Sequence, residues 1–477
     1  MSGAERRGGL PVGVLLWGAL VGVTLLRLAI AATLPLTPDE AYYWIWSRNL
    51  QTGYLDHPPM VALWIRAGTA IAGQTAFGVR WLGPVSALAG SWLIARAAQI
   101  LAPVQGGALR SAVLLNATLM VGLGAMTMTP DTPLLFFVAA AIWSVAQLLR
   151  RDDARWWLAV GACFGLACES KYTGFLAAAG CAVWWLGTRR LWKQGAWVVA
   201  GGIVGGLVVL PTLLWNAHHH WASFAKQGGR ATDWHPARAA QFLGELLGGQ
   251  IALATPLVFV LFLGGLWQAA RYARSRETSR FLIVCAGLPM AVFVQHAFGD
   301  RVQPNWPAVT YPFLVLAAAA SGQKVRAACV VGGVMTTVVY AQALFSPLPL
   351  TAHQDVIARQ TRGWDLLARD IQALRSRDSG SFVVADDYAV TSALAFHGAG
   401  LPMAGIEPRW GLLSLPMQAG AGGIFVVRAG GRVTVPVGWK LGQLKGHSCR
   451  MPGLCYDLYP LTPEAGVTTI WRIPTRA

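Results

Sequence analysis

Charged residues are scarce in this sequence. Asp, Glu, Lys and Arg make up only 12% of its 477 residues, whereas 55% are hydrophobic. Soluble globular domains carry about 25% charged residues. This shortage excludes an ordinary water-soluble fold for most of the chain, because so many apolar side chains need a solvent other than water.

The apolar residues are grouped into runs long enough to cross a bilayer as helices, which takes roughly 17–25 residues. The mean hydropathy is +0.47, and the 22 tryptophans suit the interfacial belts of a membrane protein. The sequence therefore predicts an all-α polytopic membrane protein with about eleven transmembrane helices. We expect them at residues 11–35, 78–100, 108–128, 132–149, 156–170, 173–188, 196–216, 247–269, 281–298, 306–321 and 327–345.

The basic residues are distributed unevenly, and their distribution predicts the topology. A net charge of +17 could suggest nucleic-acid binding, but Lys and Arg gather in every second short loop, as in cytoplasmic loops. The first run, 11–35, has no small-residue cleavage site, so we expect a retained helix and a cytoplasmic N-terminus. The loop residues are Arg6, Arg7, Arg96, Arg110, Arg150, Arg151, Arg155, Arg189, Arg190, Lys193, Arg271, Arg274, Arg276, Arg280, Lys324 and Arg326.

The last part of the chain has a different character. Charges there mix with short β-like runs, "FVVADD" and "GIFVVR", and with a helical segment, "RGWDLLARDIQALRSR". We therefore predict a transmembrane domain at 1–345 and a small periplasmic α/β domain at 346–477. Its cysteines, Cys449 and Cys455, could pair in an oxidising compartment. A zinc site is less favoured, because no matching second pair of ligands is present.

Acids and aromatics cluster directly after the first predicted span, in "LTPDEAYYWIWSRNLQTGYLDHPPM". "TPDE" matches a capping box, in which Thr37 caps a helix and Glu40 reaches back to it. Asp39 then points about 100° away from Glu40 and shares its face with Tyr42 and Tyr43. A carboxylate beside two phenols at the membrane surface favours a site for a hydroxyl-rich ligand. The alternative is a helix cap without a further role.

Further polar clusters are expected on the same side of the membrane. Asp131 at the start of a span has a capping role as its alternative, and Lys171 beside Glu169 has an internal ion pair as its alternative. A run of three histidines suggests a metal, although an interfacial polar loop is the simpler interpretation. The segments concerned are "GYLDHPP", "MTPDTPLLFF", "CESKYTGF", "WNAHHHWASFAKQGGR" and "FGDRVQPNWP".

Taken together and in this order, these segments resemble the GT-C superfamily of integral-membrane glycosyltransferases. The resemblance covers roughly residues 10–345 and rests on the Asp-Glu pair after the first helix, "DHPP", "PDTPLLFF", "SKYTGFL", "LLWNAHHHWASFAKQ" and "QPNWPA". It is closest to the bacterial branch with lipid A aminoarabinose transferase, lipopolysaccharide galacturonic acid transferases and relatives of protein O-mannosyltransferases. The aminoarabinose branch has Glu-Lys where this chain has Asp56-His57, and His57 is only fractionally charged at neutral pH.

The resemblance implies a GT-C fold with juxtamembrane helices in the first outer loop, and an inverting transferase in the bacterial inner membrane, expected as a monomer. The donor would be a polyprenyl-phosphate-linked sugar, and the acceptor a periplasmic lipid or glycolipid, above all lipid A or lipopolysaccharide core. It implies Asp39 as the central catalytic residue, which suits a general base. Glu40 and Asp131 are further catalytic candidates. The residues expected to bind the donor phosphate or substrate are Tyr42, Tyr43, Tyr54, His57, Lys171, Tyr172, Lys226, Arg230 and Arg301.

Two further expectations concern charge. Breaking the donor's C1–O bond leaves negative charge on phosphate, so we expect Lys171 to have that phosphate as its standing partner rather than Glu169. A divalent cation is the one cofactor considered, held by Asp56, His57 and His219.

Three other functions remain open: a protein O-glycosyltransferase of the same fold, a transporter or flippase for a lipid-linked sugar, and a catalytically silent subunit that binds a sugar-lipid. The transporter is less favoured, because the sequence shows no two-fold repeat and its acids lie at the ends of spans.

Overall fold

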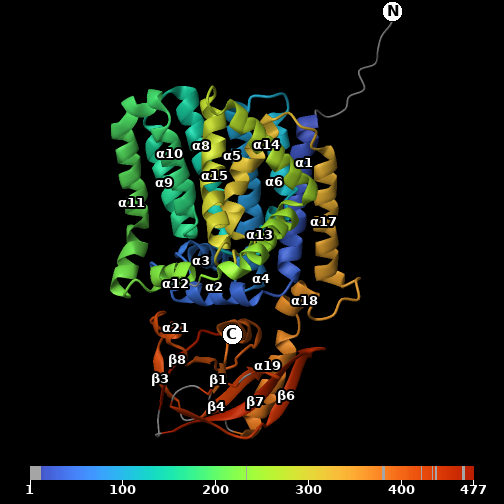
Figure 1. Ribbon diagram of the computed structural model, residues 1–477. Coiled ribbons are helices and arrows are strands. Elements are labelled where there is room, and N and C mark those ends of the chain that lie inside the picture. The colour runs from blue at the N-terminus through green and yellow to red at the C-terminus, as the bar shows by residue number, and fades with distance from the viewer. Residues whose placement is uncertain are drawn as a thin grey trace, which may run out of the picture.

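The computed structural model describes residues 12–232, 234–378, 382–420, 422–431, 433–435, 438–464 and 468–476. The chain forms a bundle of helices with a smaller α/β domain below it (Figure 1). A layer of short helices lies between these two parts, and its helix α2 carries Asp39 and Glu40.

The bundle is built from apolar helices whose bounds follow the predicted spans closely. Five helices of the described chain are long and apolar enough to cross a membrane, or six if one bent pair counts as a single span. The shorter helices lie among them (Figure 1). The bundle helices are α1 (Val12–Thr33), α5 (Leu82–Leu101), α8 (Asp131–Arg151), α9 (Trp156–Ser170), α10 (Gly174–Leu186), α11 (Gly195–His218), α15 (Glu277–Ala297), α16 (Tyr311–Ala320) and α17 (Arg326–Phe345).

Two predicted spans are interrupted. The segment expected at 108–128 forms two short helices, α6 (Gly107–Asn116) and α7 (Leu119–Gly124), with Thr118 capping the second one. The straight span expected at 247–269 does not form: α13 (Ala239–Ala254) and α14 (Pro256–Tyr272) meet at 104°. The bend falls at Thr255, because a residue before proline avoids the helical conformation.

Glycines bring α9 and α11 close together. A Cβ on Gly161 would lie 1.9 Å from the carbonyl oxygen of Gly201, and a Cβ on Gly165 would lie 2.8 Å from that of Gly205. Small residues allow this close helix packing in membranes. Next to this contact, an apolar cavity of about 290 Å³ lies between α9, α10 and α11.

The helices of the intermediate layer are α2 (Pro38–Arg48), α3 (Met60–Ala72), α4 (Ala76–Arg80) and α12 (Ala222–Thr232). They cross the lower end of the bundle rather than continuing its direction (Figure 1). Three of them come from the first outer loop, where the family resemblance places juxtamembrane helices. The side chains of α2 are mostly buried, because the bundle lies above the helix and the α/β domain below it.

The α/β domain follows α17 through α18 (Val356–Thr361) and α19 (Trp364–Asp378). Its main sheet has the order β1-β4-β7-β5, with β1 (Phe382–Ala385) parallel to β4 (Gly423–Arg428) and the other pairs antiparallel. The predicted runs "FVVADD" and "GIFVVR" supply β1 and β4. The remaining elements are β2 (Ala404–Gly405), β3 (Met417–Gly420), β5 (Trp439–Leu441), β6 (Gly446–Met451), β7 (Leu454–Pro463), β8 (Thr468–Arg472), α20 (Tyr388–His397) and α21 (Pro408–Gly411).

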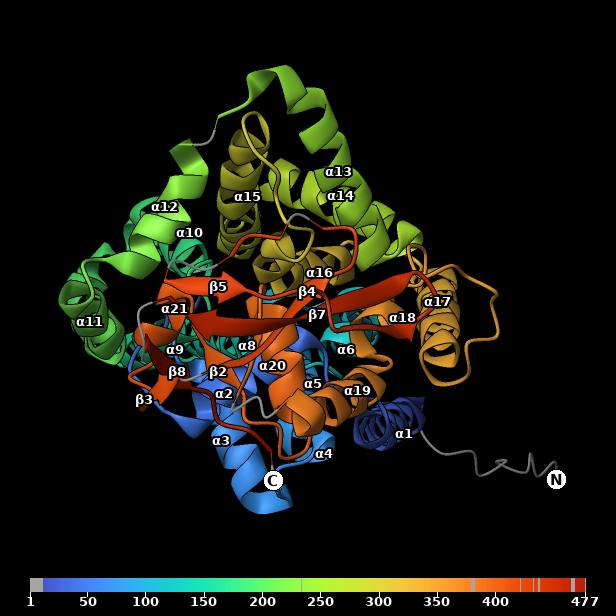
Figure 2. The ribbon, with the colours of Figure 1, turned by 90° about the horizontal axis from the view of Figure 1, so that it is seen from below.

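One face of the main sheet packs on α19 and α20, and α20 in turn packs on α2 (Figure 2). Trp44 of α2 meets Phe396 of α20 with 5.2 Å between ring centroids. The Nε2 of His397 donates to the carbonyl oxygen of Leu36, 3.1 Å away. Aromatic packing and this hydrogen bond therefore fix the α/β domain against the start of α2.

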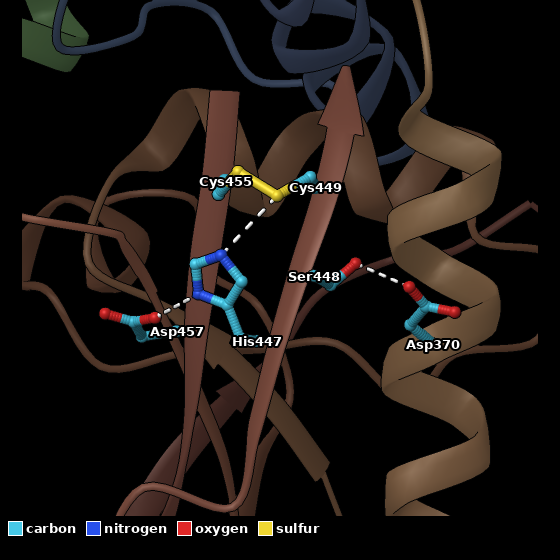
Figure 3. Close-up of a disulfide and its surroundings, with 6 residues drawn as sticks. All are labelled: Asp370, His447, Ser448, Cys449, Cys455 and Asp457. Carbon is cyan, nitrogen blue, oxygen red and sulfur yellow. Dashed lines mark hydrogen bonds and ion pairs between the residues drawn. A yellow bond between two sulfur atoms is a disulfide. The ribbon is translucent and has the colours of Figure 1, made fainter. Parts of the chain in front are cut away.

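The disulfide considered from the sequence is formed between Cys449 and Cys455, which lie opposite each other on β6 and β7 (Figure 3). On the same hairpin, His447 contacts Asp457, with 2.8 Å between Nδ1 and Oδ1. Ser448 donates to Asp370 of α19, 2.6 Å away. The cross-linked hairpin thus supports the helix that enters the domain.

Candidate active site

The first turn of α2 directs the neighbouring carboxylates of Asp39 and Glu40 to different surroundings. Thr37 and Glu40 form the predicted capping box. Both oxygens of Glu40 are also taken by Arg80, at 2.6 and 2.5 Å, and one accepts from the backbone amide of Met128 at 3.0 Å. Burial alone would raise the pKa of Glu40, but the Arg80 guanidinium lowers it overall. Glu40 is fully buried and its oxygens are occupied, which favours the capping alternative over catalysis.

Asp39 points the other way and is exposed. Its Oδ1 accepts from the hydroxyl of Tyr388, a residue of the α/β domain, at 3.3 Å. Although water reaches the carboxylate, the protein around it reduces its hydration and raises its pKa, with further contributions from Glu40, Asp56 and Asp387. Asp39 is therefore an accessible carboxylate with a raised proton affinity, which suits a general base.

Asp56 lies at the centre of a charged network. One carboxylate oxygen pairs with Lys226, and the other accepts from the Tyr42 hydroxyl at 3.0 Å. A guanidinium nitrogen of Arg409 lies 3.8 Å from the second oxygen. Burial raises the pKa of Asp56, but these cations and hydrogen bonds lower it overall. Lys226 therefore has a partner already and holds α12 against the first loop.

Lys171 and Asp131 meet in the interior. The Lys171 Nζ lies 2.8 and 2.9 Å from the two Asp131 oxygens, and the side-chain amide of Asn305 donates to Asp131 at 2.6 Å. Asp131 is thus the protein partner of Lys171, while the expected contact of Lys171 with the donor phosphate stays a prediction. Glu169 is not its partner either, as anticipated from their spacing. The internal ion pair considered for Lys171 is formed, although with a different acid.

A cavity of about 300 Å³ lies beside this ion pair, where α9 turns into α10. His57, Lys171, Tyr172 and Thr173 contribute to its wall, together with residues of α12, α15 and the segment before α16. Tyr43 of α2 lies next to this wall, since its ring is 6.1 Å from that of His57. The wall of the cavity therefore offers a cation, an imidazole and two hydroxyls.

Several predicted ligands lie apart from this space or have other roles. The Tyr54 hydroxyl donates to backbone oxygens of α2, and its ring stacks on Trp46, so Tyr54 is part of the core. Arg301 makes a two-point pair with Glu245 at the surface, at 2.6 and 3.0 Å. Arg230 lies on α12, but its side chain is outside the described residues.

The suggested metal ligands do not come together. The His219 ring stacks on Trp215 with 4.1 Å between centroids, and its Nδ1 contacts the carbonyl oxygen of that residue. Among the described residues, the ligand atoms of Asp56, His57 and His219 form no group close enough to hold one ion. A divalent cation held by Asp56, His57 and His219 therefore stays a prediction, with its ligands apart in this structure.

Comparison with known proteins shows what this chain is similar to. Residues 56–215 match the family described as dolichyl-phosphate-mannose-protein mannosyltransferase. The chain is 25% identical over 380 residues to the lipid A galacturonosyltransferase RgtD of Rhizobium johnstonii, and the match covers 75% of this chain and 76% of that protein. These similarities support a membrane glycosyltransferase of the GT-C type.

The fold of this glycosyltransferase resembles that of ArnT from Cupriavidus metallidurans. With ArnT bound to undecaprenyl phosphate, the TM-score is 0.63 at 15% identity, covering 94% of this chain and 97% of that one. With the apo state, the TM-score is 0.61 at 14% identity, covering 94% and 98%. The likeness extends beyond the bundle, since almost the whole of both chains is covered.

Sequence reasoning missed the contributions of the α/β domain to the candidate site of this glycosyltransferase. Tyr388 and Arg409 reach the acids of α2 and the first loop from positions some 350 residues later in the chain. Arg80 and Asn305, which neutralise or bond buried carboxylates, were also missed. One signal was available: "DDY" at Tyr388 repeats the acid-then-tyrosine pattern of "DEAYY".

Proposed function

We propose that this glycosyltransferase moves a sugar from a polyprenyl-phosphate carrier to lipid A or lipopolysaccharide core, at the outer face of the bacterial inner membrane. The observation that carries the proposal is the exposed carboxylate of Asp39 on α2, a helix whose Tyr43 lies next to His57 in the wall of a polar cavity of about 300 Å³. The likeness to a lipid A galacturonosyltransferase and to ArnT bound to undecaprenyl phosphate supports this choice of acceptor and donor.

In the proposed reaction, the acceptor hydroxyl loses its proton to Asp39 and attacks C1 of the donor sugar. The C1–O bond breaks, and polyprenyl phosphate leaves from the opposite face, so the anomeric configuration inverts. Lys171 and His57, in the cavity wall, would stabilise the charge that develops on the phosphate. Tyr172 and Thr173 offer hydroxyls for the sugar, because both residues line the polar cavity.

The donor's tail fits the apolar cavity of about 290 Å³ between α9, α10 and α11. Cys168 and Phe175 line that cavity, while Lys171 and Tyr172, on the turn between the same two helices, line the polar cavity. A lipid carrier could thus keep its tail in the bilayer while its phosphate reaches the site. Gly206→Leu should fill the apolar cavity and raise the KM for long-chain donors, whereas Gly22→Leu on α1 is the matched control, since both glycines have open space around them.

The proposed orientation of the protein in the membrane follows from the charges at the two ends of the bundle. Arg190 pairs with Asp152 and Glu277 at the end opposite α2, so three of the basic loops meet there. If eleven segments cross the bilayer, this end faces the cytoplasm and the α/β domain lies in the periplasm. Cysteine accessibility to a membrane-impermeant reagent, at sites placed in the 189–194 loop and on α19, tests this orientation.

The decisive experiment is transfer by purified protein in nanodiscs, with a polyprenyl-phosphate sugar as donor and lipid A as acceptor, followed by mass spectrometry. Asp39→Asn should lower the rate by about 10²–10⁴-fold, as for loss of a general base, without lowering the melting temperature. Unchanged transfer by Asp39→Asn would falsify its role as base. Modification of a periplasmic protein instead of lipid A would favour the protein O-glycosyltransferase, and donor translocation without transfer would favour the flippase.

A further inference from the structure

The carboxylate assigned as the base is contacted by a residue of a different part of the fold. The Tyr388 hydroxyl donates to Asp39 Oδ1 at 3.3 Å, across the boundary between α2 and the α/β domain. Among the described residues, this is the hydrogen bond that the Asp39 side chain accepts. In many active sites the catalytic base is itself oriented by a neighbouring side chain.

Tyr388 is itself held in place from three sides. Asp387 caps α20 by accepting from the amide of Ala389 at 2.8 Å, which fixes Tyr388 as the first residue of the helix. The centroid of its ring is 4.8 Å from that of Tyr42, and the Arg409 guanidinium lies 4.2 Å from the Tyr388 ring centroid. A phenol enclosed in this way has little freedom to turn from the carboxylate.

We propose that Tyr388 is a positioning residue for Asp39, and that the α/β domain thereby completes the active site instead of only covering it. The hydrogen bond fixes one oxygen of the base and leaves the other for the acceptor hydroxyl. Arg409 supports the arrangement by holding the Tyr388 ring. This inference rests on the proposed function of Asp39 and adds the residue that orients it.

The charged groups around Asp39 determine in which direction its pKa should change when Tyr388 is replaced. Acids come from every neighbouring element and raise its pKa: Glu40 on α2, Asp56 in the first loop and Asp387 at the start of α20. The Tyr388 hydrogen bond lowers that pKa. Tyr43, Tyr388 and Arg409 are the other titratable groups at this contact.

Tyr388→Phe keeps the ring and removes only the hydroxyl. A general base must be deprotonated to act, so the transfer rate falls as the pH drops through the pKa of Asp39. Loss of the hydrogen bond should raise this pKa, and with it the midpoint of the rate profile, by about one pH unit. We expect a lower kcat, with little change in the KM for the donor. Tyr459→Phe is the control, since Tyr459 packs with Phe425 on the opposite face of the sheet.

A second measurement does not depend on transfer. Water-soluble carbodiimide modifies protonated carboxyls, so the pH dependence of Asp39 labelling, read by peptide mass spectrometry, reports its ionisation directly. Tyr388→Phe should shift this labelling curve upward, and Tyr459→Phe should leave it in place. If both the rate profile and the labelling curve of Tyr388→Phe match the wild type, Tyr388 only packs against α2 and the proposal is wrong. Absent transfer in the wild type would instead count against the proposed function.

Discussion

Lys171 and Asp131 form a two-point ion pair inside the protein, with side chains only 5% and 3% exposed. The two residues are 40 positions apart in the sequence, on the turn after α9 and at the start of α8. Their contact joins α8 to the turn between α9 and α10, which lines the polar cavity. Each side chain is the counter-ion of the other. Replacing only one of them leaves the other buried without a counter-ion, and this lowers the stability of the folded protein.

Lys171→Ala should therefore destabilise the protein by about 3–5 kcal/mol, the usual effect of breaking a buried pair from one side. The double variant Lys171→Met with Asp131→Asn removes both charges and should regain most of that loss. Thermal unfolding in one detergent measures this, together with affinity for polyprenyl phosphate. If the double variant still binds polyprenyl phosphate weakly, Lys171 contacts the phosphate. If its affinity returns to that of the wild type, Lys171 has only a structural role.

Glu40→Gln should impair folding more than chemistry. It leaves Arg80, which is 3% exposed, without its carboxylate, and weakens the capping box of α2. We expect a loss of about 3–5 kcal/mol in the free energy of unfolding. The fraction that folds should retain its transfer rate within a few-fold. A hundredfold fall in the rate per folded molecule would contradict this and return Glu40 to the catalytic candidates.

The contact between the α/β domain and α2 should weaken in mild acid. Burial lowers the pKa of His397 to about 4, from 6.5, although its hydrogen bond to the carbonyl oxygen of Leu36 opposes this shift. Between pH 6.5 and 4 the unfolded chain binds a proton that the folded protein does not, so stability falls as the pH drops through this range, by up to about 3 kcal/mol. Comparing the unfolding of wild type and His397→Gln at pH 7 and pH 5 tests this. An equal decrease in both would exclude His397 as the cause.

The hairpin of β6 and β7 should depend on its cross-link. Non-reducing peptide mapping of protein from an oxidising periplasm should recover Cys449 and Cys455 in one disulfide-linked peptide. The loop is short, so the paired serine variant should lose no more than roughly 2–3 kcal/mol of local stability. Hydrogen exchange should report the change first in α19, which the hairpin contacts through Ser448 and Asp370. Two free thiols in the exported protein would contradict the pairing.

Much of the architecture could be predicted because it depends on local chemistry. Apolar runs that must satisfy their own backbone in lipid form helices, so most span boundaries are correct to within a few residues. The capping box at Thr37 and Glu40 needs only residues three apart. The bend at Thr255 was missed, although the proline after it was a local signal for the interruption.

The sequence by itself determined that this chain is a membrane protein with a helix at the membrane surface after its first span. It also determined that Asp39 and Glu40 point in different directions. Only the tertiary structure decided the partner of each charge. Lys171 binds Asp131, Asp56 binds Lys226, and Asp39 accepts from Tyr388. The physical reason is separation along the chain: these pairs join residues 40, 170 and 349 positions apart, so no helical period or turn brings them together. They meet because α8 packs on α9, α12 lies against the first loop, and α20 packs on α2.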